Sequence, residues 1–302
     1  MRRFLAGLAL VAILAVLALW IERELPVELP APTGPYAVGR SIEDWHEVIA
    51  WIWYPAVPNG APAEYAPAAM RAHLGGGPLR FVTHDWAKVR CHSFANAPRR
   101  PGSYPVVIFR GGASAPVVNY TTLLEDLASH GYVVVGIDAR DRASRNPELC
   151  TNTDCYNRLL ALWISDISSV ADRLGGSVGI FGHSFGGSQA AQFCAHDPRC
   201  VAGIDVDGIL LGDVVQHGIN KPFLFILSDH RNEAGSDRIR AEIQSVRKPI
   251  VILPHANHFT FSDDGAILKS RLFRALLGVD GRRQLAQTAE TVRGFFDADL
   301  KR

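Results

Sequence analysis

Residues 182–186 read Gly-His-Ser-Phe-Gly, so that a serine lies between two glycines in the pattern G-x-S-x-G. A serine hydroxyl becomes a useful nucleophile only where the backbone exposes it beside a base. Here an apolar run at 178–181 precedes the pattern and a stretch rich in alanine and glutamine follows it, which predicts a strand, a tight turn and a helix. In that setting the helix dipole favours the negative charge that develops during attack on a carbonyl. We therefore predict Ser184 as a nucleophile.

The two glycines have a steric reason in this interpretation. Side chains two residues before and two residues after the nucleophile would collide with the adjoining strand and helix, and Gly182 and Gly186 remove those atoms. The alternative is an ordinary glycine-rich turn with a capping serine.

A base for Ser184 is expected downstream, with an acid between the two in sequence. Of the eleven histidines, His255 and His258 are well placed, because both follow the last apolar run at 250–253. Loops at the carboxyl ends of parallel strands are where ligand sites form in α/β proteins. We favour His258 as the base and interpret His255 as a loop histidine that hydrogen-bonds to the backbone.

Three aspartates compete for the role of the acid. Asp205 and Asp207 follow the apolar run after the serine motif, and Asp229 follows the next one. The acid must orient the imidazole and stabilise the imidazolium ion. Spacing alone does not choose among the three.

These residues need a scaffold, and the predicted strands and helices of the chain supply one, with a regular strand–helix alternation from residue 104 onward. The predicted strands are 45–54, 89–95, 106–109, 132–137, 178–181, 201–206, 223–227 and 250–253, and the predicted helices are 121–130, 159–174, one from 185, and 283–300. Short, wholly apolar strands that alternate with helices indicate a mainly parallel central sheet with helices on both faces. The fold class is therefore α/β.

The amino terminus carries a targeting pattern. Arg2 and Arg3 precede an unbroken run of apolar or small residues at 4–21, which at about 1.5 Å per residue can span a bilayer core. We predict a membrane anchor with the remainder outside the cytoplasm, and a cleaved signal peptide is the alternative. The implied organisation is a signal anchor or signal peptide at 1–25, a proline-rich linker at 26–35 and a catalytic domain at 36–302, exported to the periplasm or another extracytoplasmic compartment.

Charge and cysteine content limit the partners. The formal net charge is +1 and no basic stretch exceeds two arginines, which argues against nucleic acid as a partner. Two cysteine pairs, Cys150 with Cys155 and Cys194 with Cys200, are spaced for local disulfides in an oxidising compartment. Zinc competes for the second pair because His196 lies within it, but the spacing lacks the Cys-x-x-Cys pattern of structural zinc sites. No metal or other cofactor is predicted.

Several segments carry a family resemblance. They are 34–39 (Gly-Pro-Tyr-Ala-Val-Gly), 53–55 (Trp-Tyr-Pro), 104–109 (Tyr-Pro-Val-Val-Ile-Phe), 127–132 (Leu-Ala-Ser-His-Gly-Tyr), 140–142 (Arg-Asp-Arg), 182–187 (Gly-His-Ser-Phe-Gly-Gly), 203–207 (Gly-Ile-Asp-Val-Asp) and 258–263 (His-x-x-Phe-x-Asp). Together they resemble the plasma-type (type II) platelet-activating factor acetylhydrolases and their bacterial relatives among the α/β-hydrolases. The resemblance implies the α/β-hydrolase fold, with Asp207 as the acid and His258 as the base.

One loop departs from that family, whose members read Ser-His-Gly where this chain has Arg110, Gly111 and Gly112. An oxyanion hole takes one backbone N–H from the residue after the nucleophile and one from this loop. By position these donors are Phe185 and Ala113. Backbone donors survive a change of side chain, but Arg110 and Gly111 could alter the pocket or the activity.

The residues and the resemblance together predict a serine ester hydrolase that works through an acyl-enzyme, with Ser184, His258 and Asp207 as its triad. The resemblance implies short or oxidised acyl chains on phospholipid-like or other small esters. The expected partners are a small-molecule ester and, through the N-terminal segment, the membrane. The alternatives are a general carboxylesterase or polyester hydrolase, and a non-catalytic anchored binding module on the same fold.

Overall fold

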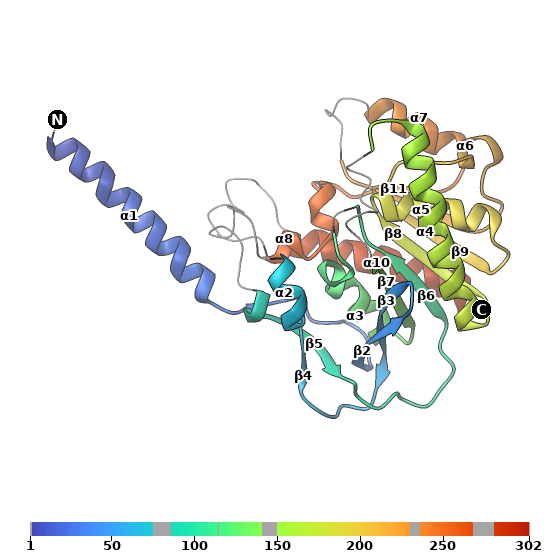
Figure 1. Cartoon of the computed structure of the whole chain (residues 1–302), viewed down its shortest axis with the longest axis horizontal. Coiled ribbons are helices and arrows are strands. Elements are labelled where there is room, and N and C mark those ends of the chain that lie inside the picture. The colour runs from blue at the N-terminus through green and yellow to red at the C-terminus, as the bar shows by residue number, and fades with distance from the viewer. Residues whose placement is uncertain are drawn as a thin grey trace.

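The computed structural model describes residues 2–74, 86–113, 115–140, 150–229, 236–267 and 281–301. Within these residues one sheet runs in the order β1-β5-β2-β3-β7-β6-β8-β9-β10-β11, with β4 paired to β5 (Figure 1). The strands are β1 Val27–Glu28, β2 Ala37–Trp45, β3 Val48–Ala56, β4 Pro62–Glu64, β5 Val89–Ala95, β6 Val106–Arg110, β7 Val133–Ala139, β8 Val178–His183, β9 Cys200–Val206, β10 Phe223–Leu227 and β11 Ile250–Ile252. Neighbours from β7 to β11 are all parallel, so their carboxyl ends meet at one edge of the sheet.

Helices cover both faces of the sheet, as the alternating pattern predicts. The α-helices are α1 Arg2–Glu24, α2 Ala68–Leu74, α3 Thr121–Ser129, α4 Thr153–Leu174, α5 Phe185–His196, α6 Val214–His217, α7 Ser236–Ser245, α8 Asp264–Ile267 and α10 Gly281–Leu300, and the 3-10 turns are η2 Trp86–Lys88, η3 Val117–Tyr120 and η5 His258–Phe261. The mainly parallel sheet between two helical layers confirms the predicted fold class.

The core divides into two layers because successive side chains of a strand point to opposite faces. In β8, Phe181 packs with Leu124 of α3 and Phe296 of α10 on one face. Its neighbour Ile180 packs with Ile167 of α4 and Ala190 of α5 on the other. A strand buried on both faces leaves its carboxyl end as the place where a polar side chain can reach solvent.

The strand predicted at 45–54 is wrong in its bounds. The structure forms a hairpin of β2 and β3 instead, and His46 turns the chain with a φ of 67°. The polar side chains of Glu43 and Asp44 concealed β2, whereas β3 continues through Pro55. Of the predicted 140–142 motif, Arg140 lies within the described residues, and 141 and 142 lie outside them.

The N-terminal segment differs from expectation in two respects. Residues 26–35, predicted as a linker, are tied to the domain, because β1 pairs with β5 and the backbone N–H of Thr33 donates to Asp126 at 2.8 Å. Residues 2–24 form α1, which extends away from the sheet (Figure 1). Among the described residues, however, no helix combines the length and the apolar character that crossing a membrane requires, so the predicted transmembrane anchor finds no support.

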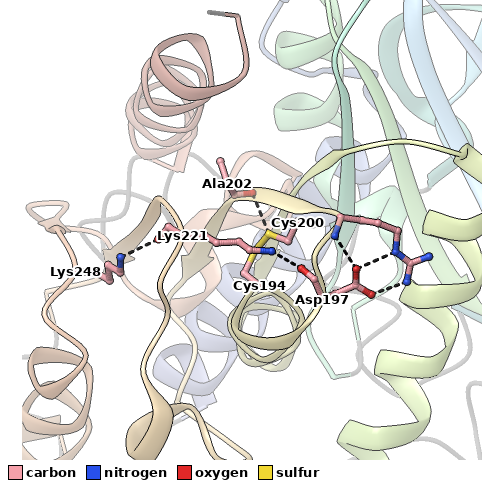
Figure 2. Close-up of a disulfide and its surroundings, with 7 residues drawn as sticks. Cys194, Asp197, Cys200, Ala202, Lys221 and Lys248 are labelled. Atoms are coloured by element: carbon pink, nitrogen blue, oxygen red, sulfur yellow. Dashed lines mark hydrogen bonds and ion pairs between the residues drawn. A yellow bond between two sulfur atoms is a disulfide. The ribbon is translucent and has the colours of Figure 1, made fainter.

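Both predicted cysteine pairs are disulfides, Cys150–Cys155 and Cys194–Cys200. The second joins the end of α5 to the start of β9 (Figure 2). Because the two sulfurs of Cys194 and Cys200 are bonded to each other, they are not available as zinc ligands. The disulfide therefore cross-links α5, the helix that follows Ser184, to β9, the strand that leads to Asp207.

Candidate active site

Ser184 lies in the turn between β8 and α5, with a φ of 57° and a ψ of −123°. A side chain in this region of φ is strained, and the surrounding structure has to hold it there. The backbone N–H of Ser184 donates to the carbonyl of Val206 on β9 at 2.8 Å. A Cβ at Gly182 would lie 2.2 Å from the carbonyl oxygen of Gly186, so this turn tolerates no side chain at that position.

His258 reaches Ser184 from the loop after β11. Its Nε2 lies 3.0 Å from Ser184 Oγ. The preceding Asn257 caps η5, since its side chain accepts the backbone N–H of Phe259 at 3.0 Å and its own N–H donates to Thr260 Oγ1 at 3.0 Å. This capping box fixes the direction from which the imidazole approaches the serine.

Asp207 lies on the other side of the same imidazole. Its Oδ2 is 2.7 Å from His258 Nδ1, and its Oδ1 accepts both the backbone N–H and the hydroxyl of Ser228 at 2.7 Å. The carboxylate is nearly fully buried. Three hydrogen bonds hold the buried carboxylate in one orientation.

The other two candidate acids lie elsewhere. Burial raises the pKa of Asp205 well above its usual range, and one of its oxygens accepts the N–H of Gly208 at 2.8 Å. Asp229 follows β10, and its backbone N–H donates to Ala256. The carboxylate in contact with His258 is that of Asp207, as the resemblance implies.

Asp263, the last residue of the 258–263 motif, anchors the loop that carries His258. Its Oδ1 accepts the backbone N–H of Thr122 at 3.2 Å and its Oδ2 accepts the hydroxyl of Tyr65 at 3.2 Å. Burial raises the pKa of Asp263 well above its usual range. The motif's aspartate thus ties η5 to the start of α3 and takes no part in the contact with Ser184.

The structure places the two predicted oxyanion donors at the start of α5 and in the loop after β6. Phe185 is the first residue of α5, so its backbone N–H has no acceptor in a preceding helical turn. Ala113, in the loop after β6, packs against a small apolar cluster that we call the Trp163 cluster. The cluster consists of Ala139, Leu159, Trp163 and Phe185, with Ala113, Cys150 and Leu211 packed against it.

Arg110, the departure in the oxyanion loop, is buried and directed toward α4 and α5. Its guanidinium donates to Gln189 Oε1 at 2.9 Å and to the carbonyl of Ile137 at 2.6 Å, and it lies 3.9 Å from the centre of the Trp163 ring. A cation stacked on an indole and tied to the backbone holds that ring in place. The change to arginine therefore shapes the Trp163 cluster, which the sequence pattern of α4 did not reveal as part of a site.

His183 is a second residue that the sequence analysis missed, although it occupies the variable position of the motif. Its ring centre lies 4.5 Å from that of His258. Among the described residues, His183, Asp207 and His258 are the group whose potential metal-ligand atoms all lie within 4.8 Å of one another. Because His258 already bonds Asp207 and Ser184, the arrangement suits proton transfer.

Comparisons with known proteins find an esterase and acetylhydrolases among the similar sequences. The family model for chlorophyllase matches residues 92–196. A probable 1-alkyl-2-acetylglycerophosphocholine esterase of Arthroderma benhamiae is 25% identical over 202 residues, which cover 58% of this chain and 52% of that protein. The platelet-activating factor acetylhydrolase of Cavia porcellus is 24% identical over 323 residues, covering 81% of this chain and 74% of the relative. The chain thus matches about half the length of the fungal relative and more of the mammalian one.

Solved structures agree on the fold. A ferulic acid esterase from Streptomyces cinnamoneus superposes with a TM-score of 0.73 at 22% identity, over 90% of this chain and 93% of that one. A putative dienelactone hydrolase from Klebsiella pneumoniae superposes with a TM-score of 0.50 at 17% identity, over 84% of this chain and 99% of that one. The superpositions show an α/β-hydrolase fold, and in sequence the chain is similar to platelet-activating factor acetylhydrolases and a related esterase.

Proposed function

We propose that the protein hydrolyses short-acyl carboxylic esters, phospholipid-like esters among them, through an acyl-enzyme on Ser184. The observation that carries the proposal is the chain of hydrogen bonds from Asp207 through His258 to Ser184, at 2.7 Å and 3.0 Å. A histidine placed between a carboxylate and a hydroxyl is the arrangement that makes serine a nucleophile at neutral pH.

The reaction proceeds in two halves. As Ser184 Oγ attacks the ester carbonyl, His258 Nε2 takes its proton, and the N–H groups of Phe185 and Ala113 donate to the oxyanion. The ester C–O bond then breaks and the imidazolium protonates the departing alkoxide. In the second half His258 takes a proton from water, the hydroxide adds to the acyl carbon, and Ser184 Oγ leaves with the proton returned. Asp207 stabilises the imidazolium in both halves.

The Trp163 cluster is our reason for proposing that the acyl group is short. It adjoins both oxyanion donors, so the acyl chain of a bound ester would extend toward it. Its aromatic members, Trp163 and Phe185, are only 6% and 7% exposed and meet edge to face with ring centres 6.4 Å apart. Since these rings already fill the space, a short acyl group fits there better than a long one.

A series of p-nitrophenyl esters with acyl chains from two to twelve carbons tests the proposal. We expect turnover of acetyl and butyryl esters that falls with chain length, and no turnover by Ser184→Ala. A matched control is Ser103→Ala, which changes an exposed serine. A folded wild-type protein that turns over no ester would contradict the proposal and favour a binding module, and faster turnover of the longest chains would contradict the short-acyl assignment.

We also propose that this catalytic domain, residues 36–302, works outside the cytoplasm. The two disulfides support export, because such bonds persist in oxidising compartments. Fractionation of expressing cells, with free thiols blocked at lysis, tests the assignment. We expect the protein in the extracytoplasmic fraction with four cysteines that label only after reduction, whereas cytoplasmic protein with all thiols free would contradict it.

A further inference from the structure

The loop that carries the oxyanion donor Ala113 is held from one side by a buried tyrosine. The backbone N–H of Gly112 donates to the hydroxyl oxygen of Tyr120 at 3.1 Å. Tyr120 belongs to η3 and is fully buried. Gly112 directly precedes Ala113, whose backbone N–H is the second donor of the oxyanion hole. The contact with Tyr120 therefore constrains the backbone next to that donor.

The same hydroxyl contacts the residue before the nucleophile. Tyr120 Oη lies 2.8 Å from Nδ1 of His183, which is 6% exposed. The oxyanion loop and the serine turn are therefore connected through one tyrosine oxygen and one imidazole. The imidazole of His258 lies tilted against this ring, with the ring centres 4.5 Å apart.

His183 is the neutral partner in this connection. Burial and the nearby charge of His258 lower the pKa of His183 to about 3, against smaller opposing effects of Asp207 and the His258 backbone. Nε2 of His183 is buried and makes no well-formed hydrogen bond within the described residues. A neutral imidazole can accept a hydrogen bond at Nδ1, so the Tyr120 hydroxyl can accept a hydrogen bond from the N–H of Gly112 and donate one to His183.

We propose that Tyr120 and His183 are positioning residues that hold the oxyanion loop in register with Ser184, so that Ala113 meets the oxyanion at hydrogen-bond distance. This inference rests on the proposed ester hydrolysis. Neither side chain contacts the substrate, and each acts through the backbone that it holds. Their effect falls on the transition state, because the oxyanion hole is occupied fully only there.

The space around Gly112 explains why the hydroxyl has this influence. A Cβ at Gly112 would lie 3.3 Å from Tyr120 Oη, 3.4 Å from Ser184 Cβ and 3.5 Å from His183 Nδ1. The loop backbone thus lies directly against the nucleophile, with no side chain of its own to fix it. Without the tyrosine hydroxyl, the loop can shift by a fraction of an ångström, which is enough to weaken a donor whose useful range is about 2.7–3.1 Å.

The central test is Tyr120→Phe, which removes only the hydroxyl. We expect kcat for a short-chain ester to fall about 10- to 100-fold with KM changed less than about twofold, since losing an oxyanion donor outright costs about 100- to 1000-fold. The affinity for a trifluoromethyl ketone, which forms a tetrahedral anion on the serine, should fall in proportion to kcat/KM. A merely structural role of Tyr120 would not produce this proportionality.

Tyr132→Phe is the matched control. Tyr132 is also fully buried, and its hydroxyl donates to Asp297 at 2.8 Å, next to α10 and away from the serine turn. We expect a comparable loss of thermal stability with kcat and ketone affinity unchanged. If Tyr120→Phe keeps wild-type kcat, or if Tyr132→Phe loses as much, the inference is overturned.

A second test compares two substitutions of His183, one that keeps a hydrogen-bond acceptor and one that removes it. His183→Asn places an amide oxygen near the position of Nδ1 and should keep most of kcat, whereas His183→Leu should lose it to the level of Tyr120→Phe. The double variant Tyr120→Phe/His183→Leu should lose no more than either single variant, because both remove one connection. Fully additive losses would overturn the connection. A wild-type protein without esterase activity would instead refute the proposed function, so the two failures are distinguishable.

Discussion

Asp207 shows how a single side chain is selected for a role that several neighbours could fill by sequence. It combines a φ of 55° at the end of β9 with two hydrogen bonds from Ser228, the residue that follows β10. Asp205, two residues earlier, accepts the N–H of Gly208 instead, and burial raises its pKa well above its usual range. The difference between the two aspartates lies in backbone conformation and in a partner that is distant in sequence, and neither can be read from local spacing.

Exchange of the acid gives a prediction at this scale. Asp207→Asn preserves shape but presents an amide to His258 Nδ1, which favours the wrong imidazole tautomer, so kcat should fall by about 10⁴-fold with folding retained. Asp229→Asn, at the end of the next strand, should keep kcat within about threefold. Steady-state kinetics with thermal unfolding of both variants decides, and a larger loss from Asp229→Asn would contradict the assignment.

At the scale of elements, the serine turn is held by the strand and the helix on either side of it and by the disulfide at the far end of α5. Lys221 donates to the backbone carbonyl of Asp197, in the turn closed by Cys194 and Cys200, and Lys248 donates to the carbonyl of Lys221 at 2.8 Å (Figure 2). These contacts join α5, β9 and the segments before β10 and β11. The strands that lead to Asp207 and His258 are therefore fixed relative to the helix that begins after Ser184.

The close packing of the turn predicts a large effect of one methyl group. In Gly186→Ala the new Cβ would lie 2.3 Å from the carbonyl oxygen of Arg110, so we expect a loss of about 3 kcal/mol or more of unfolding free energy, or failure to fold. The control Gly294→Ala, on the exposed side of α10 with no atom within 4 Å, should instead gain about 0.5–1 kcal/mol. Denaturant unfolding measures both, and a Gly186→Ala protein with wild-type stability would contradict the packing argument.

Helix α4 supplies the wall of the proposed acyl site, which gives a prediction about specificity. Trp163→Ala removes the ring that stacks on Arg110 and closes the Trp163 cluster. We expect kcat/KM for hexanoyl and octanoyl esters to rise at least about tenfold relative to acetyl esters, because the vacated volume admits a longer chain. Leu162→Ala, on the exposed side of the same helix, should leave the chain-length profile unchanged. An unchanged profile in Trp163→Ala would place the acyl chain elsewhere.

At the scale of the whole molecule, buried acids make stability depend on pH. The folded chain keeps the proton of Asp205 while the unfolded chain ionises it above about pH 3.9, so this group lowers stability as pH rises from that value. Asp205→Asn keeps an acceptor for the N–H of Gly208 and removes the titration. Its gain in unfolding free energy over wild type should therefore be larger at pH 7 than at pH 4, as urea unfolding would show, and an equal difference at both pH values would contradict this account.

The architecture was predictable because it depends on periodicity. Apolar runs such as 223–227 are buried on both faces and were recognisable as strands, and the glycines around Ser184 marked the turn by their steric necessity. The hairpin of β2 and β3 was not recognisable, because β2 carries charged side chains and the turn at His46 lacks glycine. The tie between residues 26–35 and the domain also depends on distant partners.

Of the candidate site, only the residues marked by a sequence motif or by their order along the chain were predictable. Ser184, His258 and Asp207 meet as expected, with the acid chosen by family resemblance. Tyr120 and Trp163 were missed, because a buried aromatic residue on a helical turn has the same pattern whether it fills a core or holds a loop. Their roles follow from contacts with Gly112 and Arg110, which lie on other elements.

The most direct test of the central claim is the site of covalent modification. Wild-type protein is treated with a fluorophosphonate ester, digested, and mapped by mass spectrometry. The account predicts one adduct per chain on Ser184, and its loss in Ser184→Ala and in His258→Ala, both folded by circular dichroism. An adduct on another residue, or ester hydrolysis that continues after Ser184→Ala, would contradict it.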